Sequence, residues 1–332
     1  MSLHFLSTTA PAPNTGGELG GAWLGEFAPA QRSAWPMQGI FAPLFGSTAA
    51  VVHETWLAQP PLVAGENEGI VWRRTEAALY GVIELDEAQF AASSAESALQ
   101  KASNEAYQRI FRLLDAQQVP HLWRVWNYLA RINQESDGLE RYRQFNIGRQ
   151  EAFIAAQRGA TGNVPAACAL GLASGPLSIA FLAGTTPAVP VENPRQISAY
   201  HYPADYGPRS PTFSRAALVY PAGQEILFVS GTASIVGHQT VHVEDVAGQC
   251  RETLANIAAV VAEANRQAKS PAFSLDTLTY RVYVRHAADF PLIRDIVQAT
   301  LGEAAVLYLQ ADVCRHDLLL EIEAQGIHPW EG

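Results

Sequence analysis

The sequence contains very little lysine. Of its 22 lysine and arginine residues, only Lys101 and Lys269 are lysines, and both lie in polar segments. Neither segment is apolar enough to desolvate an amine, which excludes Schiff-base chemistry with a carbonyl substrate. No Gly-Lys-Ser/Thr triplet occurs, so a phosphate-binding P-loop is excluded as well. The simplest cause of the arginine bias is GC-rich coding.

Cysteine and metal-binding motifs are also scarce. The three cysteines, Cys168, Cys250 and Cys314, form no CxxC pair, and the N-terminus does not resemble a secretory signal, so we expect a cytoplasmic location. No HExxH or GxSxG motif occurs. His238 and His242 lie in a strand-like segment, where a spacing of four residues separates them by about 13 Å. We therefore expect no metal site.

An excess of positive charge, which nucleic-acid-binding proteins need, is absent. Asp and Glu number 32 against 22 Lys and Arg, a net charge of −10, so we expect no nucleic-acid partner. One uncharged stretch, 159–191, is long enough on paper to cross a membrane. Pro165, Gly171, Gly175 and Pro176 divide it into pieces of about ten residues. We predict two buried strands joined at 174–176 and no membrane segment.

The spacing of apolar residues predicts four helices and several strands. In 246–266, Cys250, Leu254, Ile257 and Val261 recur at intervals of three and four residues, which is typical of a helix packed on a sheet. The first 60 or so residues show no sustained period, so we expect only short strands and loops there. The other predicted helices are 96–117, 139–156 and 289–301, and the other predicted strands are 122–132, 225–234, 279–286, 305–310 and 318–324.

The two halves of the chain repeat one order of predicted elements. Arg-Val-Trp at 124–126 even resembles Arg-Val-Tyr at 281–283. We predict an α/β (α+β) protein built of two units, 1–190 and 191–332, with mixed sheets and helices packed on one face. The boundary is expected in the proline-rich segment 185–194. A single irregular α/β domain is the alternative.

Two carboxylates lie in the apolar strand predicted for 318–324. Alternation places Glu321 and Glu323 on one face and Leu320 and Ile322 on the other. Two interpretations stay open. In one, the strand lies at a sheet edge with a solvated acidic face. In the other, Glu321 faces a partly dry cleft, where loss of water favours its protonated form and makes it a general acid near neutral pH.

The segment 200–215 gathers three tyrosines, among them Tyr202, and two arginines on a proline-stiffened loop. Arg209 and Arg215 can bind carboxylates through two parallel hydrogen bonds. In an acidic protein, such a positive pocket indicates a small dianionic substrate. A surface loop capped by aromatic residues is the alternative. Arginines elsewhere are expected to extend the same pocket: Arg149, Arg281 and Arg285.

Between residues 228 and 324 the sequence resembles the RidA/YjgF imine deaminases. The resemblance implies a RidA/YjgF-like (chorismate-mutase-like) fold for the second unit and a divergent copy of it in the first. That family carries an arginine fifteen residues before the glutamate that opens its Glu-Ile-Glu-Ala motif. This chain has Val306 at that position, so deaminase activity is not implied. The likeness is carried by Val-Ser-Gly-Thr-Ala-Ser at 229–234, Gly-Gln at 248–249, Leu-Ala-Asn-Ile at 254–257, Asp-Phe at 289–290 and Glu-Ile-Glu-Ala at 321–324.

The whole chain resembles the chorismatases. That resemblance implies cleavage of the enolpyruvyl ether of chorismate to pyruvate and hydroxybenzoate, either 3-hydroxybenzoate alone or with 4-hydroxybenzoate. The family's essential glutamate falls on Glu321, and Cys314 marks the hydroxybenzoate-forming branch. Gly231 and Ala233 resemble the other product-determining position. The likeness is carried by the loop 200–215, Ser-Gly-Thr-Ala at 230–233, Tyr-Val-Arg-His at 283–286, and the spacing between Cys314 and Glu321.

The implied reaction needs few parts. An enol ether resists weak nucleophiles until its methylene carbon is protonated, so the site needs one acid and cations that hold two carboxylates. Glu321 and the arginines supply these parts, and no metal or organic cofactor is required. Cys314 and Glu321, seven residues apart, converge only if 312–317 bends. A buried structural thiol is the alternative for Cys314.

Two other functions stay open. A RidA-like imine deaminase hydrolyses 2-aminoacrylate, whereas a non-catalytic metabolite-binding protein binds chorismate without releasing pyruvate. RidA-like units usually trimerise, and an internal duplication replaces some of those contacts. We therefore expect a monomer or a homotrimer.

Overall fold

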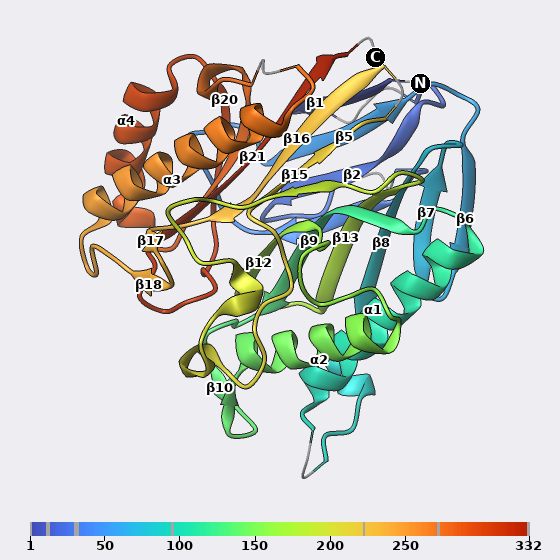
Figure 1. Cartoon of the computed structure of the whole chain (residues 1–332), viewed down its shortest axis with the longest axis horizontal. Coiled ribbons are helices and arrows are strands. Elements are labelled where there is room, and N and C mark those ends of the chain that lie inside the picture. The colour runs from blue at the N-terminus through green and yellow to red at the C-terminus, as the bar shows by residue number, and fades with distance from the viewer. Residues whose placement is uncertain are drawn as a thin grey trace.

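The computed structural model describes residues 2–10, 14–29, 33–93, 96–221, 223–270 and 273–330. Its two largest sheets hold six and seven strands, and N-terminal residues form a third sheet of four (Figure 1). Each large sheet carries two helices on its outer face. These are α1 (Ala98–Ala116) and α2 (Arg141–Ala155) on the six-stranded sheet, and α3 (Val246–Gln267) and α4 (Phe290–Leu301) on the seven-stranded sheet.

The six-stranded sheet has the order β12-β9-β13-β8-β7-β6, with only β9 and β12 parallel. Two of its strands come from the uncharged stretch 159–191, which confirms the prediction of buried strands there. No helix in the described part of the chain is long and apolar enough to cross a membrane. The strands are β6 (Val63–Asn67), β7 (Ile70–Arg74), β8 (Ala78–Leu85), β9 (His121–Ala130), β12 (Ala166–Leu172) and β13 (Leu177–Gly184).

The seven-stranded sheet has the order β14-β15-β16-β21-β19-β20-β4. The predicted strand 305–310 is confirmed in its full length, and the others begin or end within a few residues of the prediction, except that β21 continues five residues further. The strands are β4 (Leu44–Phe45), β14 (Val189–Val191), β15 (Ala216–Val219), β16 (Gln224–Thr232), β19 (Thr279–Val284), β20 (Ala305–Gln310) and β21 (Leu320–Pro329).

Both large sheets repeat one topology. In the first, β8, β13, β9 and β12 are neighbours in that order, and in the second β16, β21, β19 and β20 are. The last two strands of each series are parallel, and a helix connects them. The chain passes from one sheet to the other between β13 and β14, within the proline-rich segment 185–194. This repetition supports two units of one design, whose boundary at residue 190 stays a prediction.

The N-terminal residues form more structure than the sequence predicts. Four strands form a mixed sheet in the order β1-β5-β2-β3, in which only β2 and β3 are parallel. Their buried side chains join a core that lies between the helix-free faces of the two large sheets; Trp56, for example, contacts Phe228 with ring centroids 5.7 Å apart. The strands are β1 (Leu3–Thr8), β2 (Glu18–Gly25), β3 (Met37–Phe41) and β5 (Val51–Ala58).

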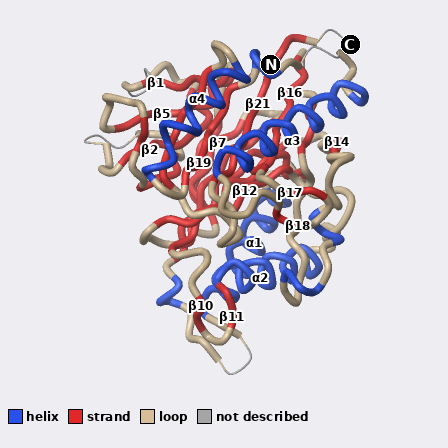
Figure 2. Tube along the Cα trace, turned by 90° about the vertical axis from the view of Figure 1, so that its left-hand side faces the viewer, coloured by secondary structure: helices blue, strands red, loops and turns tan. Residues whose placement is uncertain are grey.

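The helices begin where the sequence provides caps. The side chain of Ser97 accepts a hydrogen bond from the backbone N–H of Gln100 (3.1 Å), and Asp245 accepts one from Gly248 (2.9 Å). Figure 2 shows α3 and α4 in front of the strands, with α1 and α2 at the lower end of the molecule. The remaining short elements are the hairpins β10 (Glu135–Ser136) with β11 (Leu139–Glu140) and β17 (Ile235–Val236) with β18 (Gln239–Thr240), and the 3-10 turns η1 (Glu87–Gln89), η2 (Ala199–His201), η3 (Ala204–Tyr206), η4 (Leu275–Thr277) and η5 (Ala287–Asp289).

Candidate active site

The site is built on β21, which lies in the middle of its sheet. Hydrogen-bonded neighbours on both sides, β16 and β19, show that the interpretation of an edge strand with a solvated acidic face is wrong. Glu321 is 3% exposed and Glu323 5% exposed. Leu320 and Ile322 point the other way, into the core beneath α3 and α4. The predicted alternation is therefore correct, and the acidic face is buried between the two large sheets.

A cavity of about 160 Å³ opens beside Glu321 at the junction of the two units. Its walls come from the start of α2, the loop 202–215, the end of β16 and the bend before β21. Six residues that the sequence analysis singled out line it: Glu321, Cys314, Tyr202, Arg215, Gly231 and Ala233. The other lining residues are Glu140, Tyr142, Arg143, Asp205, Tyr206, Pro211, Phe213, Ile235, Arg315, His316 and Asp317.

The surroundings of Glu321 keep its carboxyl group protonated near neutral pH. Burial raises the pKa of Glu321 to about 8, and the negative charge of Glu323 acts in the same direction. The Arg124 and Arg215 guanidinium groups and the Cys314 thiol oppose this effect without cancelling it. A carboxylic acid with this pKa donates a proton readily at neutral pH.

The carboxyl group of Glu321 occupies space that only a glycine leaves free. A Cβ atom at Gly231 would lie 1.9 Å from Oε1 of Glu321 and 2.7 Å from its Cδ. It would also lie 3.1 Å from Cβ of Cys168, which backs the same position from β12. The missing side chain at Gly231 is thus a condition for the observed position of the acid.

Cys314 reaches the site because the chain bends. Residues 314–317 form a bend and a turn between the isolated bridge of Asp312 with Gly171 and the start of β21. Cys314 and Glu321 therefore both line the cavity, as the predicted bend requires. Burial and the nearby Glu321 carboxyl raise the pKa of the Cys314 thiol to about 12. The side chain is therefore a protonated thiol at neutral pH, able to fill space and donate a weak hydrogen bond.

Arg215 presents a guanidinium group to the cavity. Its Nη2 donates to the backbone oxygen of Ile197 (2.8 Å) and to the Tyr202 hydroxyl (2.7 Å), which orients the group. Its Nε is buried and has no hydrogen-bond partner among the described residues. An unpartnered N–H in a dry site favours a bound anion.

Arg315 was not predicted as a site residue. Its guanidinium carbon lies 4.1 Å from the ring centroid of Tyr206 and 5.1 Å from that of Tyr202, while Nη1 donates to the His238 backbone oxygen (2.9 Å). Its Nη2 is buried without a described partner. The sequence feature that could have identified Arg315 is its position directly after Cys314, in the bend predicted for 312–317. Tyr142, also missed, lies in a polar run at the start of α2.

Three predicted binding residues do not line the cavity. Arg149 is buried on α2 against aromatic rings; its guanidinium carbon lies 5.1 Å from the ring centroid of Tyr107. Arg209 is exposed on the surface of its loop. Arg285 donates to Asp312 (2.7 Å) and to several backbone oxygens of the bend, so it supports the bend from behind. The sequence could not separate them from Arg215, because spacing along the chain does not show which guanidinium group faces the cavity, which is enclosed by aromatic rings, which is exposed to solvent and which is already paired.

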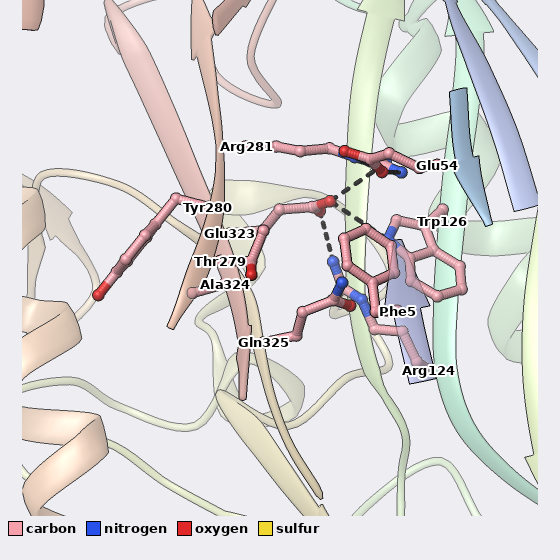
Figure 3. A pocket seen from close by; sticks show the side chains of 10 residues that line it. All are labelled: Phe5, Glu54, Arg124, Trp126, Thr279, Tyr280, Arg281, Glu323, Ala324 and Gln325. Carbon is pink, nitrogen blue, oxygen red and sulfur yellow. Dashed lines mark hydrogen bonds and ion pairs between the residues drawn. The ribbon is translucent and has the colours of Figure 1, made fainter. Parts of the chain in front are cut away.

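Arg281, also expected in the positive pocket, faces a different one. It belongs to a buried network of four charged side chains around a small cavity of about 20 Å³ (Figure 3). Arg281 donates to Glu54 on β5 through Nε (2.7 Å), and its Nη1 lies 3.3 Å from Oε1 of Glu323. Arg124 on β9 also pairs with Glu323. The pairing of Arg281 with two carboxylates leaves it no free face toward Glu321.

Comparison with known proteins agrees with this architecture. A family model described as "Chorismatase FkbO/Hyg5-like, N-terminal" matches residues 54–183. A chorismatase of Streptomyces rapamycinicus is 41% identical over 81% of this chain and 80% of its own length, and a 3-hydroxybenzoate synthase of Streptomyces hygroscopicus is 40% identical over 67% of this chain and 68% of its own. A crystal structure of a chorismatase superimposes with a TM-score of 0.86 at 32% identity, covering 98% of both chains. The chain belongs to the chorismatase family.

Proposed function

We propose that this protein cleaves the enolpyruvyl ether of chorismate to pyruvate and a hydroxybenzoate, with Glu321 as the general acid. The observation that carries the proposal is a buried glutamic acid, protonated near neutral pH, in the wall of a cavity that also contains guanidinium groups. The names of the relatives, chorismatase and 3-hydroxybenzoate synthase, point to the same substrate.

The proton donor addresses the difficult step of the reaction. Protonation of the vinyl methylene carbon converts the enol ether into a cation that water or a neighbouring hydroxyl group can attack. The Glu321 carboxyl lies on the cavity wall, and its raised pKa keeps the proton available until substrate arrives. After transfer, the carboxylate is a negative charge beside the developing cation, which it stabilises.

Two arginines are placed to hold the substrate's two carboxylates. Arg215 and Arg315 both line the cavity, and each keeps one buried N–H group without a described partner. Their orienting contacts, Tyr202 for the first and Tyr206 for the second, reduce the entropy lost when substrate binds. We infer that these two residues form the carboxylate clamp.

The direct test is incubation of the purified protein with chorismate, followed by separate assays of pyruvate and of aromatic products. We expect pyruvate and hydroxybenzoate in equal amounts. Binding of chorismate without pyruvate release would instead indicate a metabolite-binding protein. Accelerated hydrolysis of 2-aminoacrylate would indicate a RidA-like deaminase, which Val306 on β20 disfavours.

Replacement of Arg215 by lysine tests the clamp. Lysine keeps the charge but cannot bind a carboxylate through two parallel hydrogen bonds, and it also loses the orienting bond to Tyr202. We expect kcat/KM for chorismate to fall about tenfold or more, mainly through KM, in steady-state assays of pyruvate release. The control is Arg266→Lys on the exposed side of α3, which should behave like the parent. Equal kinetics for both variants would remove Arg215 from the clamp.

Replacement of Cys314 by alanine tests the product branch. The thiol fills space beside Glu321 that a water molecule would otherwise occupy, and it can donate a weak hydrogen bond there. We expect pyruvate release to stay within about tenfold of the parent, while product shifts from hydroxybenzoate toward a non-aromatic dihydroxycyclohexadiene carboxylate. Chromatography of the products measures the shift.

Cys250 supplies the matched control for that experiment. It is a fully buried cysteine on the core-facing side of α3 and does not line the cavity. Cys250→Ala should lower the melting temperature and leave the product ratio unchanged. If Cys314→Ala behaves in the same way, Cys314 is a structural thiol.

We further propose a cytoplasmic location and a small-molecule substrate without a nucleic-acid partner. All three cysteines are free thiols, which is usual in a reducing compartment. The net charge of −10 disfavours polyanions. Monomer and homotrimer are both compatible with these observations, and light scattering of the purified protein distinguishes them.

A further inference from the structure

A second glutamate lies next to the proposed acid but outside the substrate cavity. Glu323 follows Glu321 by two residues on β21, so both side chains leave the same face of the strand. Glu323 lines the small neighbouring cavity with Arg124, Trp126 and Arg281 (Figure 3). Because it does not line the larger cavity, the proposed reaction leaves it without a role.

Glu323 is bound by two ion pairs and one hydrogen bond. Its Oε1 accepts a hydrogen bond from Nε1 of Trp126 (3.2 Å) and lies 3.3 Å from Nη1 of Arg281, and its Oε2 pairs with Arg124. These partners come from β9 and β19. The two guanidinium groups fix the position of the Glu323 carboxyl group.

The network around Glu323 is already balanced. Arg124 and Arg281 contribute two positive charges, and Glu54 and Glu323 contribute two negative ones. All four side chains are at least nine-tenths buried. An ionised Glu321 would add a fifth charge beside this balanced network, at a side chain that is itself only 3% exposed.

We propose that Glu323, fixed by Arg124 and Arg281, is a positioning residue that keeps the catalytic proton on Glu321 until substrate binds. This inference rests on the proposed function for its catalytic meaning. Glu323 does not touch the substrate cavity and acts through its charge alone.

Other groups facing Glu321 do not replace this effect. Arg124 and Arg215 are positive and favour loss of the proton, so the negative charge of Glu323 is the charge that opposes them. The cavity wall also carries the acidic Glu140, Asp205 and Asp317, the basic Arg143 and Arg315, and His316, which come from the start of α2, the loop 202–215 and the bend before β21. The neighbouring hydroxyls and thiols have pKa values that burial raises, so they are neutral at pH 7. They are Tyr142 on α2, Cys168 on β12, Tyr283 on β19 and Cys314 in the bend.

Glu323→Gln isolates the charge. Glutamine keeps the size of the side chain and an acceptor oxygen for Trp126 but leaves the network with one excess positive charge. We expect Glu321 to lose its proton about one pH unit lower or more than in the parent. Infrared difference spectroscopy measures this directly, through the carbonyl stretch of a protonated carboxyl group, assigned by its loss in Glu321→Gln. The alkaline limb of the kcat profile should shift by the same amount.

A charge-balanced double variant separates this role from a structural one. Arg124→Gln alone removes a positive charge, so Glu321 should hold its proton to higher pH. Combined with Glu323→Gln, it leaves the balanced pair of Arg281 and Glu54, and the titration should return toward that of the parent. A purely structural role of Glu323 predicts that the double variant is no closer to the parent than the single one, and that result overturns the proposal.

The infrared titration needs no substrate, so its outcome is independent of the proposed reaction. An unchanged Glu321 titration in Glu323→Gln overturns this inference even if the parent cleaves chorismate. A parent that releases no pyruvate, but whose Glu321 band shifts as expected, refutes the proposed function and supports the electrostatic role. If Glu323→Gln alone does not fold, the double variant is compared with Arg124→Gln, from which it differs only at Glu323: loss of the Glu321 proton at lower pH in the double variant supports the proposal, and the same titration in both overturns it.

Discussion

Replacing Glu321 by glutamine should lower the rate of pyruvate release from chorismate by at least about 10²-fold, because general acid catalysis contributes about 10² to 10⁴. Glutamine preserves the shape of the side chain beside Gly231 but has no proton to give. The loss should appear in kcat, since the carboxylate clamp is untouched. Stopped-flow or steady-state assays with coupled detection of pyruvate measure it. Turnover near that of the parent would refute Glu321 as the acid.

The control for this variant is its stability. Burial raises the pKa of Glu321 to about 8 in the folded protein, from 4.5 for a glutamate in water. Between these values the folded state holds a proton that the unfolded state releases, so the free energy of unfolding falls as pH rises from about 4.5 to 8. Glutamine does not titrate, so Glu321→Gln should be at least as stable as the parent above pH 8. Thermal melts across this range separate lost chemistry from lost folding.

Replacing Gly231 by alanine should lower kcat by about 10²-fold, because misplacing a catalytic group by about 1 Å costs that much. The added Cβ would lie 1.9 Å from Oε1 of Glu321, and Cys168 closes the space behind it. The carboxyl group must therefore move away from its observed position. Pyruvate assays measure kcat, and product chromatography shows whether the displaced acid also changes the hydroxybenzoate yield.

Gly302 provides the control for the added methyl group. It is the C-cap of α4 and does not line the cavity, and nothing lies within 4 Å of a Cβ placed there. Its φ of +62° makes Gly302→Ala strained, so we expect a lower melting temperature and an unchanged kcat. A Gly231→Ala variant with parental kcat would show that the acid tolerates a different position.

Several site residues were within reach of sequence reasoning because their chemistry is local. Glu321 was recognisable as a carboxylate in an apolar strand, and Tyr202 and Arg215 as part of a rigid loop rich in donors. Arg149, Arg209 and Arg285 share the same residue type but lie outside the cavity wall. Their tertiary surroundings decide between them: Asp312 engages Arg285, aromatic rings enclose Arg149 on α2, and Arg209 is exposed on its loop, whereas Arg215 lines the cavity.

By itself, the sequence determined the helices, most strands and the alternation of β21, because these depend on periodicities of 3.6 and 2 residues that are readable along the chain. Only the tertiary structure decided that β21 is a central strand, that its acidic face is dry, and that Glu54 from the N-terminal sheet completes the charge network around Glu323. Burial and charge balance depend on elements more than 200 residues apart, such as Glu54 and Arg281, whose separation is 227 residues. Local patterns carry no information about which distant side chains exclude water from a carboxyl group. This exclusion raises the pKa of Glu321 and so allows it to act as an acid near neutral pH.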